Sequence, residues 1–356
     1  MNQSTPIIAI SIGDPNGIGP EIIFKALGRR DIQQLGTFVI FAPGNLWNFY
    51  KKTFNETLVY SLIDKKEDIK NGKINVLNYK NSDFKVDFGL ASKQAGKVAF
   101  DSLNEAAMAV KKGFCDLLIT APINKAEIQA DEFDFPGHTE FLEHLWGGKN
   151  LMFMVHENIK VGLVTQHIPV KEISNNITKN SVISKLKLLN QSLKNDFNIQ
   201  IPKIAVTGLN PHSGDQGLIG HEEIEQIIPA LQEAIDSGLK VFGPYPADSF
   251  FDAQTLKKFD GVLAMYHDQG LTPFKTIAGI EGVNFTAGLP FVRTSPDHGV
   301  GYDIANQFIA NETSMVEAIY TAIEIWQNRK MNQELHNNAL QVDPEVKKSR
   351  KSARYE

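Results

Sequence analysis

Short apolar runs alternate with longer amphipathic stretches along most of this chain. The runs with the continuity of buried parallel strands are residues 6–12, 37–42, 116–120, 203–207 and 261–266. Helical periodicity falls between several of them, near residues 96–111, 183–194, 222–237 and 315–328. This alternation predicts an α/β fold with mostly parallel strands and helices on both faces of the sheet.

A different pattern follows residue 150. Residues 151–155 and 160–165 are strand-like and are separated by a short turn at Glu157 and Asn158, which is typical of an antiparallel hairpin. A chain of 356 residues is long enough for two domains. We therefore expect two α/β/α lobes with a cleft between them, the hairpin marking the second lobe.

The composition is that of an ordinary globular protein, with 42% hydrophobic and 22% charged residues. The net charge of −5, from 36 basic and 41 acidic residues, argues against nucleic-acid binding. The sequence contains no apolar run long enough for a membrane span and no signal-peptide pattern, so we expect a cytoplasmic protein. One cysteine, Cys115, excludes an intramolecular disulfide.

Three histidines each follow the end of a predicted strand: His167, His212 and His267. Ligand sites of α/β proteins lie beyond the carboxyl ends of their strands. Three imidazoles with an open fourth position are a common divalent-metal ligand set. If the three loops converge, the chain is a metal-dependent enzyme.

Other loops allow two interpretations each. Residues 13–20 form a glycine-rich turn before a helix, either an anion site or only a tight turn. Residues 120–125 either face a cleft or cap a helix. In residues 135–142, His138 and Thr139 either contact a phosphate, or Thr139 is the N-cap of the helix that follows.

Two cations and an amide near the C-terminal end suit an anionic substrate, phosphate above all. They are Lys275, Asn284 and Arg293. As a bare charge pair, Lys275 and Arg293 would more often be solvated surface residues.

Several of these phrases together resemble the 4-hydroxythreonine-4-phosphate dehydrogenase family of vitamin B6 biosynthesis. The phrases are residues 13–21, 120–125, 136–142, 208–215, 243–251, 265–275 and 293–299. The resemblance extends over about residues 6–328 and implies an isopropylmalate dehydrogenase-like fold. In that fold residues 1–130 and 280–330 share one lobe and residues 131–279 form the other. Residues 331–356 lie outside the resemblance, and their composition predicts a polar tail.

The resemblance implies NAD- or NADP-dependent oxidation of 4-phosphooxy-L-threonine at C3. Decarboxylation to 3-amino-2-oxopropyl phosphate follows, in the pathway to pyridoxal phosphate. It also implies a homodimer whose metal site lies near the interface and holds one zinc, magnesium or cobalt ion. The metal ligands would be His167, His212 and His267.

The resemblance also assigns the substrate contacts, which are His138, Thr139, Lys275, Asn284 and Arg293. Residues 298–305 are similar to the segment with which isocitrate and isopropylmalate dehydrogenases hold adenosine, so His298 and Asp303 would bind the cofactor. The alternative for Asp303 is a helix cap. For catalysis, Asp248 would either accept the hydroxyl proton or order a metal ligand, and Lys275 would help neutralise the developing oxyanion.

Two alternatives to this function stay open. A paralogous dehydrogenase of a 4-phospho-threonate or 4-phospho-erythronate would keep the metal, phosphate and cofactor sites. An acyltransferase of the phosphate acetyltransferase kind is a more distant alternative, because it needs neither the three histidines nor the segment at residues 298–305.

Overall fold

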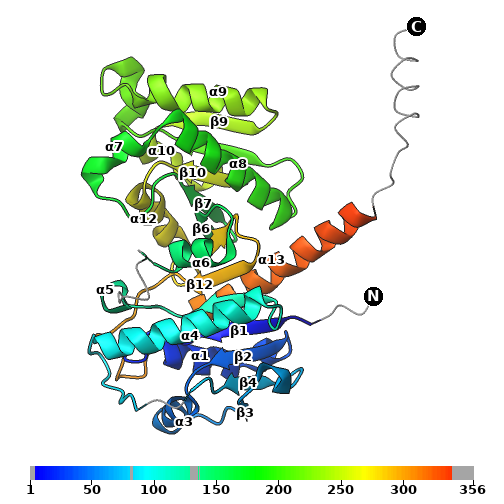
Figure 1. The fold of residues 1–356 in the computed structure, drawn as a ribbon. Helices are drawn as coiled ribbons and strands as arrows, with labels where there is room; N and C mark the ends of the chain where they lie inside the picture. The colour runs from blue at the N-terminus through cyan, green and yellow to red at the C-terminus, as the bar shows by residue number, and fades with distance from the viewer. Residues whose placement is uncertain (1–4, 81–82, 129–134, 136, 339–356) are drawn as a thin grey trace.

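The computed structural model describes residues 5–80, 83–128, 135 and 137–338 (Figure 1). The strands are β1 (Ile7–Ser11), β2 (Thr37–Phe41), β3 (Ser61–Ile63), β4 (Ile74–Leu77), β5 (Leu117–Thr120), β6 (Leu151–His156), β7 (Ile159–Leu163), β8 (Lys203–Thr207), β9 (Lys240–Tyr245), β10 (Gly261–Ala264), β11 (Val283–Ala287) and β12 (Val292–Pro296).

The longer helices are α1 (Gly19–Gly28), α3 (Gly44–Thr53), α4 (Lys93–Lys111), α6 (His138–Trp146), α8 (Lys179–Asn195), α9 (Ile228–Asp236), α12 (His267–Ala278) and α13 (Thr313–Asn337). Single helical turns are α2 (Arg30–Gln33), α5 (Lys125–Ile128), α7 (Ile173–Asn176), α10 (Ala247–Phe250), α11 (Ala253–Leu256), η1 (Lys66–Asp68), η2 (Val170–Glu172), η3 (Pro211–Gly217) and the π-helical turn η4 (Glu223–Ile227).

All the strands pair in one sheet, in the order β3-β4-β2-β1-β5-β12-β11-β6-β7-β10-β8-β9. The pairs on both sides are parallel, while β12–β11, β11–β6 and β6–β7 in the middle are antiparallel. The predicted α/β fold with a largely parallel sheet and the predicted hairpin are therefore confirmed. The sheet itself is continuous through both halves of the molecule, and the assignment of residues to two lobes stays a prediction.

Apolar side chains cover both faces of the sheet because successive residues of a strand point to opposite faces. In β1, Ile8 and Ile10 join the core that includes α1, α3, α8, α9 and α13, whereas Ala9 joins the core under α4 and α6. Further along the sheet, that second face is covered by α10, α11 and α12. Burial on both faces explains why these strands are almost uniformly apolar.

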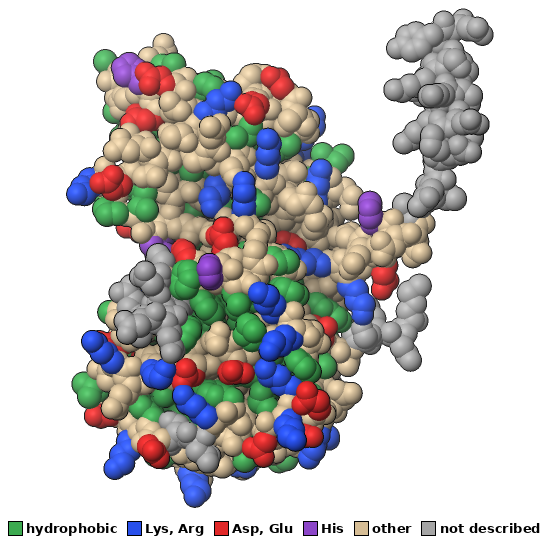
Figure 2. All heavy atoms as spheres, in the orientation of Figure 1, with side chains coloured by type: hydrophobic (Ala, Val, Ile, Leu, Met, Phe, Trp, Pro, Cys, Tyr) green, Lys and Arg blue, Asp and Glu red, His purple; other side chains and the backbone are tan. Residues whose placement is uncertain are grey.

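Acidic and basic side chains are intermixed on the face of the molecule seen in Figure 2. Among the helices that the structure describes, none combines the length and apolar character that a membrane crossing requires. Helix α13 continues to Asn337, past the expected end at residue 328. The remainder of the expected polar tail, residues 339–356, lies outside the described residues.

Ser102 of α4 ties this helix to the sheet. Its fully buried hydroxyl donates to the carbonyl oxygen of Phe41 (2.6 Å) and accepts from the backbone N–H of Ile12 (3.0 Å). We predict that Ser102→Ala lowers the free energy of unfolding by about 1–3 kcal/mol, because it leaves a buried N–H unpaired. Urea denaturation measures the loss. Ser237→Ala, an exposed control, should change it by less than about 0.5 kcal/mol, and equal losses would contradict the assigned role.

Candidate functional site

His167 and His267 lie side by side at the ends of neighbouring parallel strands. Thr165 makes the connection, donating from its backbone N–H (3.1 Å) and its hydroxyl (2.8 Å) to the carbonyl oxygen of Met265. The two imidazole centroids are 5.4 Å apart. The structure thus brings together two of the three predicted metal ligands.

Each ring has a charged partner at one of its nitrogens. The Nδ1 atom of His267 is 2.7 Å from the Asp268 carboxylate, and an N–H at Nδ1 that donates to this carboxylate orients the ring with Nε2 pointing away from it. The Nζ atom of Lys125 lies 3.2 Å from the Nε2 atom of His167 and donates to its lone pair. Burial, then the charges of Lys125 and His267, lower the pKa of His167 to about 4. A neutral imidazole is the form that binds a metal ion.

His212 stands apart from this pair. It lies on η3, which follows β8, and its side chain is exposed. Within the described part of one chain, no three His, Cys, Asp or Glu side chains come close enough to hold a metal ion. Helix α10, which carries the exposed Asp248, packs against η3. The predicted proton acceptor and the third predicted ligand therefore belong to one local unit.

A buried cation occupies the centre of the sheet. The Arg293 side chain, from β12, is in a residue only 2% exposed, and it donates to the hydroxyls of Thr120 (2.6 and 3.1 Å) and Thr286 (3.1 Å). Burial lowers the pKa of this guanidinium, and the charge of Glu140 acts in the opposite direction. In the described part of the chain no carboxylate lies within ion-pair distance of it. A buried charge is costly without a counter-ion, so an anion bound here would compensate for the burial of this guanidinium.

Helix α6 brings His138 and Thr139 to this cation. The N-cap of α6 is Gly137, so Thr139 is not the N-cap and lies in the first turn instead. The hydroxyl of Thr139 is 3.5 Å from that of Thr286. The Nε2 atom of His138 is shielded from solvent and has no hydrogen-bond partner among the described residues. Burial, Arg293 and Lys125 lower the pKa of His138 well below its ordinary value.

Lys275 and Asn284 come from α12 and β11. The ammonium of Lys275 contacts the Asp297 carboxylate (3.1 Å) and the Asp297 carbonyl oxygen (3.2 Å). Burial raises the pKa of Asp297, and Lys275 opposes that shift. The Oδ1 atom of Asn284 is a second buried acceptor that lacks a partner in the part of the chain described. An unpaired Nε2 and an unpaired Oδ1 near a buried guanidinium are what a polar ligand would satisfy.

The segment at residues 298–305 packs against the glycine-rich turn at residues 13–20. Tyr302 donates to the Asp14 carboxylate (2.6 Å) and accepts from the Asn124 side chain (3.2 Å). The backbone N–H of Ile18 donates to Val300, and a Cβ on Gly17 would lie 2.2 Å from the Val300 side chain. The N–H groups of residues 16–18 are thus used within the protein, which favours the tight-turn interpretation over an anion site.

Within the cofactor candidates, His298 and Asp303 differ in their surroundings. Burial lowers the pKa of His298, whose Nε2 atom has no partner among the described residues, and its Nδ1 atom lies 3.0 Å from the carbonyl oxygen of Gly299. The Asp303 side chain is exposed in a series of turns, and no helix begins there. The helix-cap alternative for Asp303 is therefore wrong.

Sequence reasoning passed over several residues that this geometry makes important. Thr120 and Thr286 hold Arg293, while Lys125 contacts His167 and contributes its charge at both His167 and His138. Thr120 and Lys125 stand in a loop whose polar residues were noticed. Thr286 carried no signal, because a threonine within a strand is ordinary.

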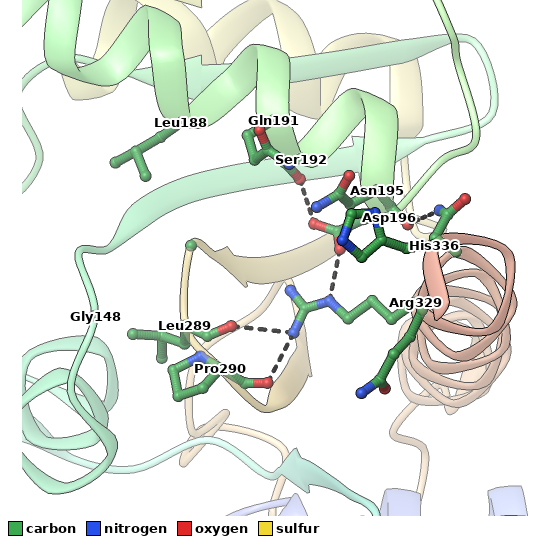
Figure 3. A pocket seen from close by; sticks show the side chains of 13 residues that line it. Gly148, Leu188, Gln191, Ser192, Asn195, Asp196, Leu289, Pro290, Arg329 and His336 are labelled. Atoms are coloured by element: carbon green, nitrogen blue, oxygen red, sulfur yellow. Dashed lines mark hydrogen bonds and ion pairs between the residues drawn. The ribbon is translucent and has the colours of Figure 1, made fainter. Parts of the chain in front are cut away.

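A cavity of about 810 Å³ lies between α8, α13 and the turn before β12 (Figure 3). None of the candidate residues lines it. Its charged groups are already paired, since Asp196 accepts from Ser192 (2.6 Å) and from Arg329 (2.6 Å), and Arg329 also donates to the carbonyl oxygens of Leu289 and Pro290. Asp196 and Arg329 therefore already neutralise each other and do not call for a charged ligand in this cavity.

Comparisons with known proteins identify the family of this chain. The family model described as pyridoxal phosphate biosynthetic protein PdxA matches residues 35–322. A 4-hydroxythreonine-4-phosphate dehydrogenase of Bacteroides thetaiotaomicron is 42% identical over 96% of this chain and 94% of its own length. A putative D-threonate 4-phosphate dehydrogenase of Oceanobacillus iheyensis is 37% identical over 90% and 98%.

A solved structure extends the likeness to the fold. The crystal structure of 4-hydroxythreonine-4-phosphate dehydrogenase from Klebsiella pneumoniae superposes with a TM-score of 0.80 at 34% identity. The match covers 92% of this chain and all of that one. The chain belongs to the family of the pyridoxal phosphate biosynthetic protein PdxA.

Proposed function

We propose that this protein oxidises 4-phosphooxy-L-threonine at C3 with NAD or NADP and releases 3-amino-2-oxopropyl phosphate after decarboxylation. One observation carries the proposal. Arg293 is buried without a described counter-ion, and its charge acts on His138, whose buried Nε2 atom has no partner among the described residues. A phosphate monoester supplies the negative charge and the oxygen atoms that this arrangement lacks.

In the proposed site, residues of β12 and α6 bind the phosphate, and a residue of α12 contributes to catalysis. Arg293 offers charged donors, and Thr139 and His138 approach from the first turn of α6, where backbone N–H groups favour an anion. Lys275 lies on α12, the helix that begins at His267. In the proposed reaction its ammonium neutralises the oxyanion that develops at C3, and Asp248 accepts the hydroxyl proton.

Two groups absent from the chain complete the proposed site. His167 and His267 would hold one zinc, magnesium or cobalt ion together with His212 of the partner subunit in a homodimer. Such an ion supplies Lewis-acid chemistry at the substrate oxygen. The nicotinamide cofactor, which accepts the hydride from C3, would be held through His298 and Asp303. We place the enzyme in the cytoplasm, where the oxidised NAD or NADP that accepts the hydride would be available.

The second candidate is the phosphorylated threonate, and the name of the Oceanobacillus iheyensis relative favours testing it. Purified protein should be assayed with each substrate and each cofactor by NADH or NADPH absorbance. We predict higher kcat/KM with 4-phosphooxy-L-threonine and loss of activity after a chelator, restored by zinc, magnesium or cobalt. Preference for the threonate phosphate would establish the second candidate, and full activity in metal-stripped protein would refute the metal site.

Substitutions of Arg293 and Asp303 should each weaken the binding of a different ligand, so that each variant is the control for the other. Arg293→Ala removes a buried charged donor and should weaken substrate binding by about 2–4 kcal/mol, with little effect on NAD. Asp303→Ala should weaken NAD more than the substrate. Steady-state KM values for both ligands test the pair. An unchanged substrate KM in Arg293→Ala, or equal losses for both ligands in Asp303→Ala, would contradict the assignments.

Stability should depend on pH through His138. Its folded pKa is depressed, so below about pH 6.5 the unfolded chain binds a proton that the folded chain does not. The contribution is therefore complete above pH 6.5 and is lost as the pH falls from there toward the folded pKa. The thermal midpoint of ligand-free protein should drop over this range, and His138→Gln should reduce the drop. His144→Gln, an exposed change on the same helix, should leave the drop unaltered.

A further inference from the structure

The turn that carries His212 has an unfavourable backbone. His212, Ser213, Asp215 and Gln216 have φ angles of 53°, 53°, 41° and 56°. Residues with a Cβ atom rarely adopt this left-handed region, and a run of them is rarer still. The surrounding structure must therefore hold the turn in place.

A buried carboxylate provides that hold. Glu223 is 1% exposed, and its Oε1 atom accepts from the backbone N–H groups of Leu209 (2.7 Å) and Asn210 (2.8 Å). Its Oε2 atom accepts from the Asn210 side chain (2.9 Å). In the described structure no cation pairs with it, so these donors are what compensate for its burial.

The same carboxylate contacts both ends of the turn. A Cβ added to Gly208, before the turn, would lie 3.1 Å from Oε1. A Cβ added to Gly214, inside it, would lie 2.6 Å from Oε2. The absence of side chains at Gly208 and Gly214 leaves room for the carboxylate, which in turn fixes where the backbone between them can run.

Glu223 opens the π-helical turn η4, and π-helical turns are frequent at functional sites. On the other side of Gly208, Gln269 of α12 donates to its carbonyl oxygen (2.7 Å) and accepts from the N–H of Met265 (2.7 Å). The base of the His212 turn is thus fixed between the helix that begins at His267 and the carboxylate of Glu223.

We propose that Glu223 is a positioning residue for His212, and that its carboxylate raises the metal affinity of the site by holding this turn in its left-handed conformation. The inference rests on the proposed function, in which His212 is a metal ligand. It assigns Glu223 a role beyond packing, because a packing residue alone would affect stability without acting through one imidazole.

The test measures zinc affinity of the full-length protein by competition with a chromophoric chelator. Glu223→Gln keeps the shape of the side chain and the Oε1 acceptor. Its new amide nitrogen replaces Oε2 and faces the side-chain nitrogen of Asn210, so that two hydrogen-bond donors oppose each other. We predict at least about tenfold weaker zinc binding, the size typical of changes to groups that orient metal ligands, with unchanged NAD binding. Glu225→Gln, an exposed control close by, should bind zinc as the wild type does.

A double-mutant cycle with His212→Ala separates positioning from general stability. If Glu223 acts through His212, adding Glu223→Gln to His212→Ala causes no further loss of zinc affinity. Additive losses, or unchanged affinity in Glu223→Gln, would overturn this inference alone. No loss in His212→Ala would overturn the proposed metal site and this inference with it.

Asn210→Ala gives the same test if Glu223→Gln does not fold. It removes the side-chain donor to Oε2 and leaves both backbone donors, so zinc affinity should fall less than in Glu223→Gln and again only when His212 is present. Hydrogen exchange checks the cause directly. The amides of Leu209 and Asn210 should exchange faster in Glu223→Gln, and unchanged protection of both would count against the proposal.

Discussion

The burial of the Arg293 guanidinium is the constraint around which this site is arranged. The residue lies on β12, which pairs in parallel with β5 and in antiparallel with β11, where the sheet changes from one pattern to the other. That position gives the guanidinium hydroxyls from both neighbouring strands, Thr120 and Thr286, but no described anion. The two hydroxyls accept hydrogen bonds from the guanidinium without neutralising its positive charge. A bound phosphate would supply the missing negative charge.

Burial, reinforced by the same cations, lowers the pKa values of two histidines of the site, His138 and His167. Arg293 and Lys125 disfavour a proton on His138, and Lys125 disfavours one on His167. Burial acts in the same direction, so both rings are neutral near pH 7. A neutral His167 can bind a metal ion, and a neutral His138 can donate or accept one hydrogen bond at its unpaired Nε2. The proposed phosphate-binding residue His138 and the proposed metal ligand His167 therefore have two causes of a lowered pKa in common, burial and the charge of Lys125.

Much of the fold followed from periodicity, because strands buried on both faces have no polar positions to obscure them. Strands β1, β2, β5, β8 and β10 and the β6–β7 hairpin were all predicted. Strand β9 was missed because it contains glycine and proline and is largely exposed at the edge, and β11 and β12 because functional phrases overlap them. In the site, loop positions after strands indicated His167 and His267 as neighbours. The position of His212 was not predictable, since it lies in a turn with left-handed backbone angles for which the sequence gives no signal.

In the proposed site different residues face different parts of the substrate, and only some of those parts distinguish the two candidate substrates. The phosphate and the C3 hydroxyl are common to phosphorylated hydroxythreonine and to phosphorylated threonate. In the proposed site, Arg293, His138 and the three metal-ligand candidates would therefore contact features that do not distinguish the two compounds. The two compounds differ at C2, where one has an amino group and the other a hydroxyl. A protonated amine only donates hydrogen bonds, whereas a hydroxyl both donates and accepts. An acceptor facing C2 is satisfied by either group, because both donate, whereas a donor facing C2 pairs with the hydroxyl and is left unpaired against the ammonium. The unpaired Oδ1 of Asn284 is an acceptor and suits both groups. A side chain that presents an N–H or O–H group to C2 would therefore be the feature that selects the threonate phosphate over the amine.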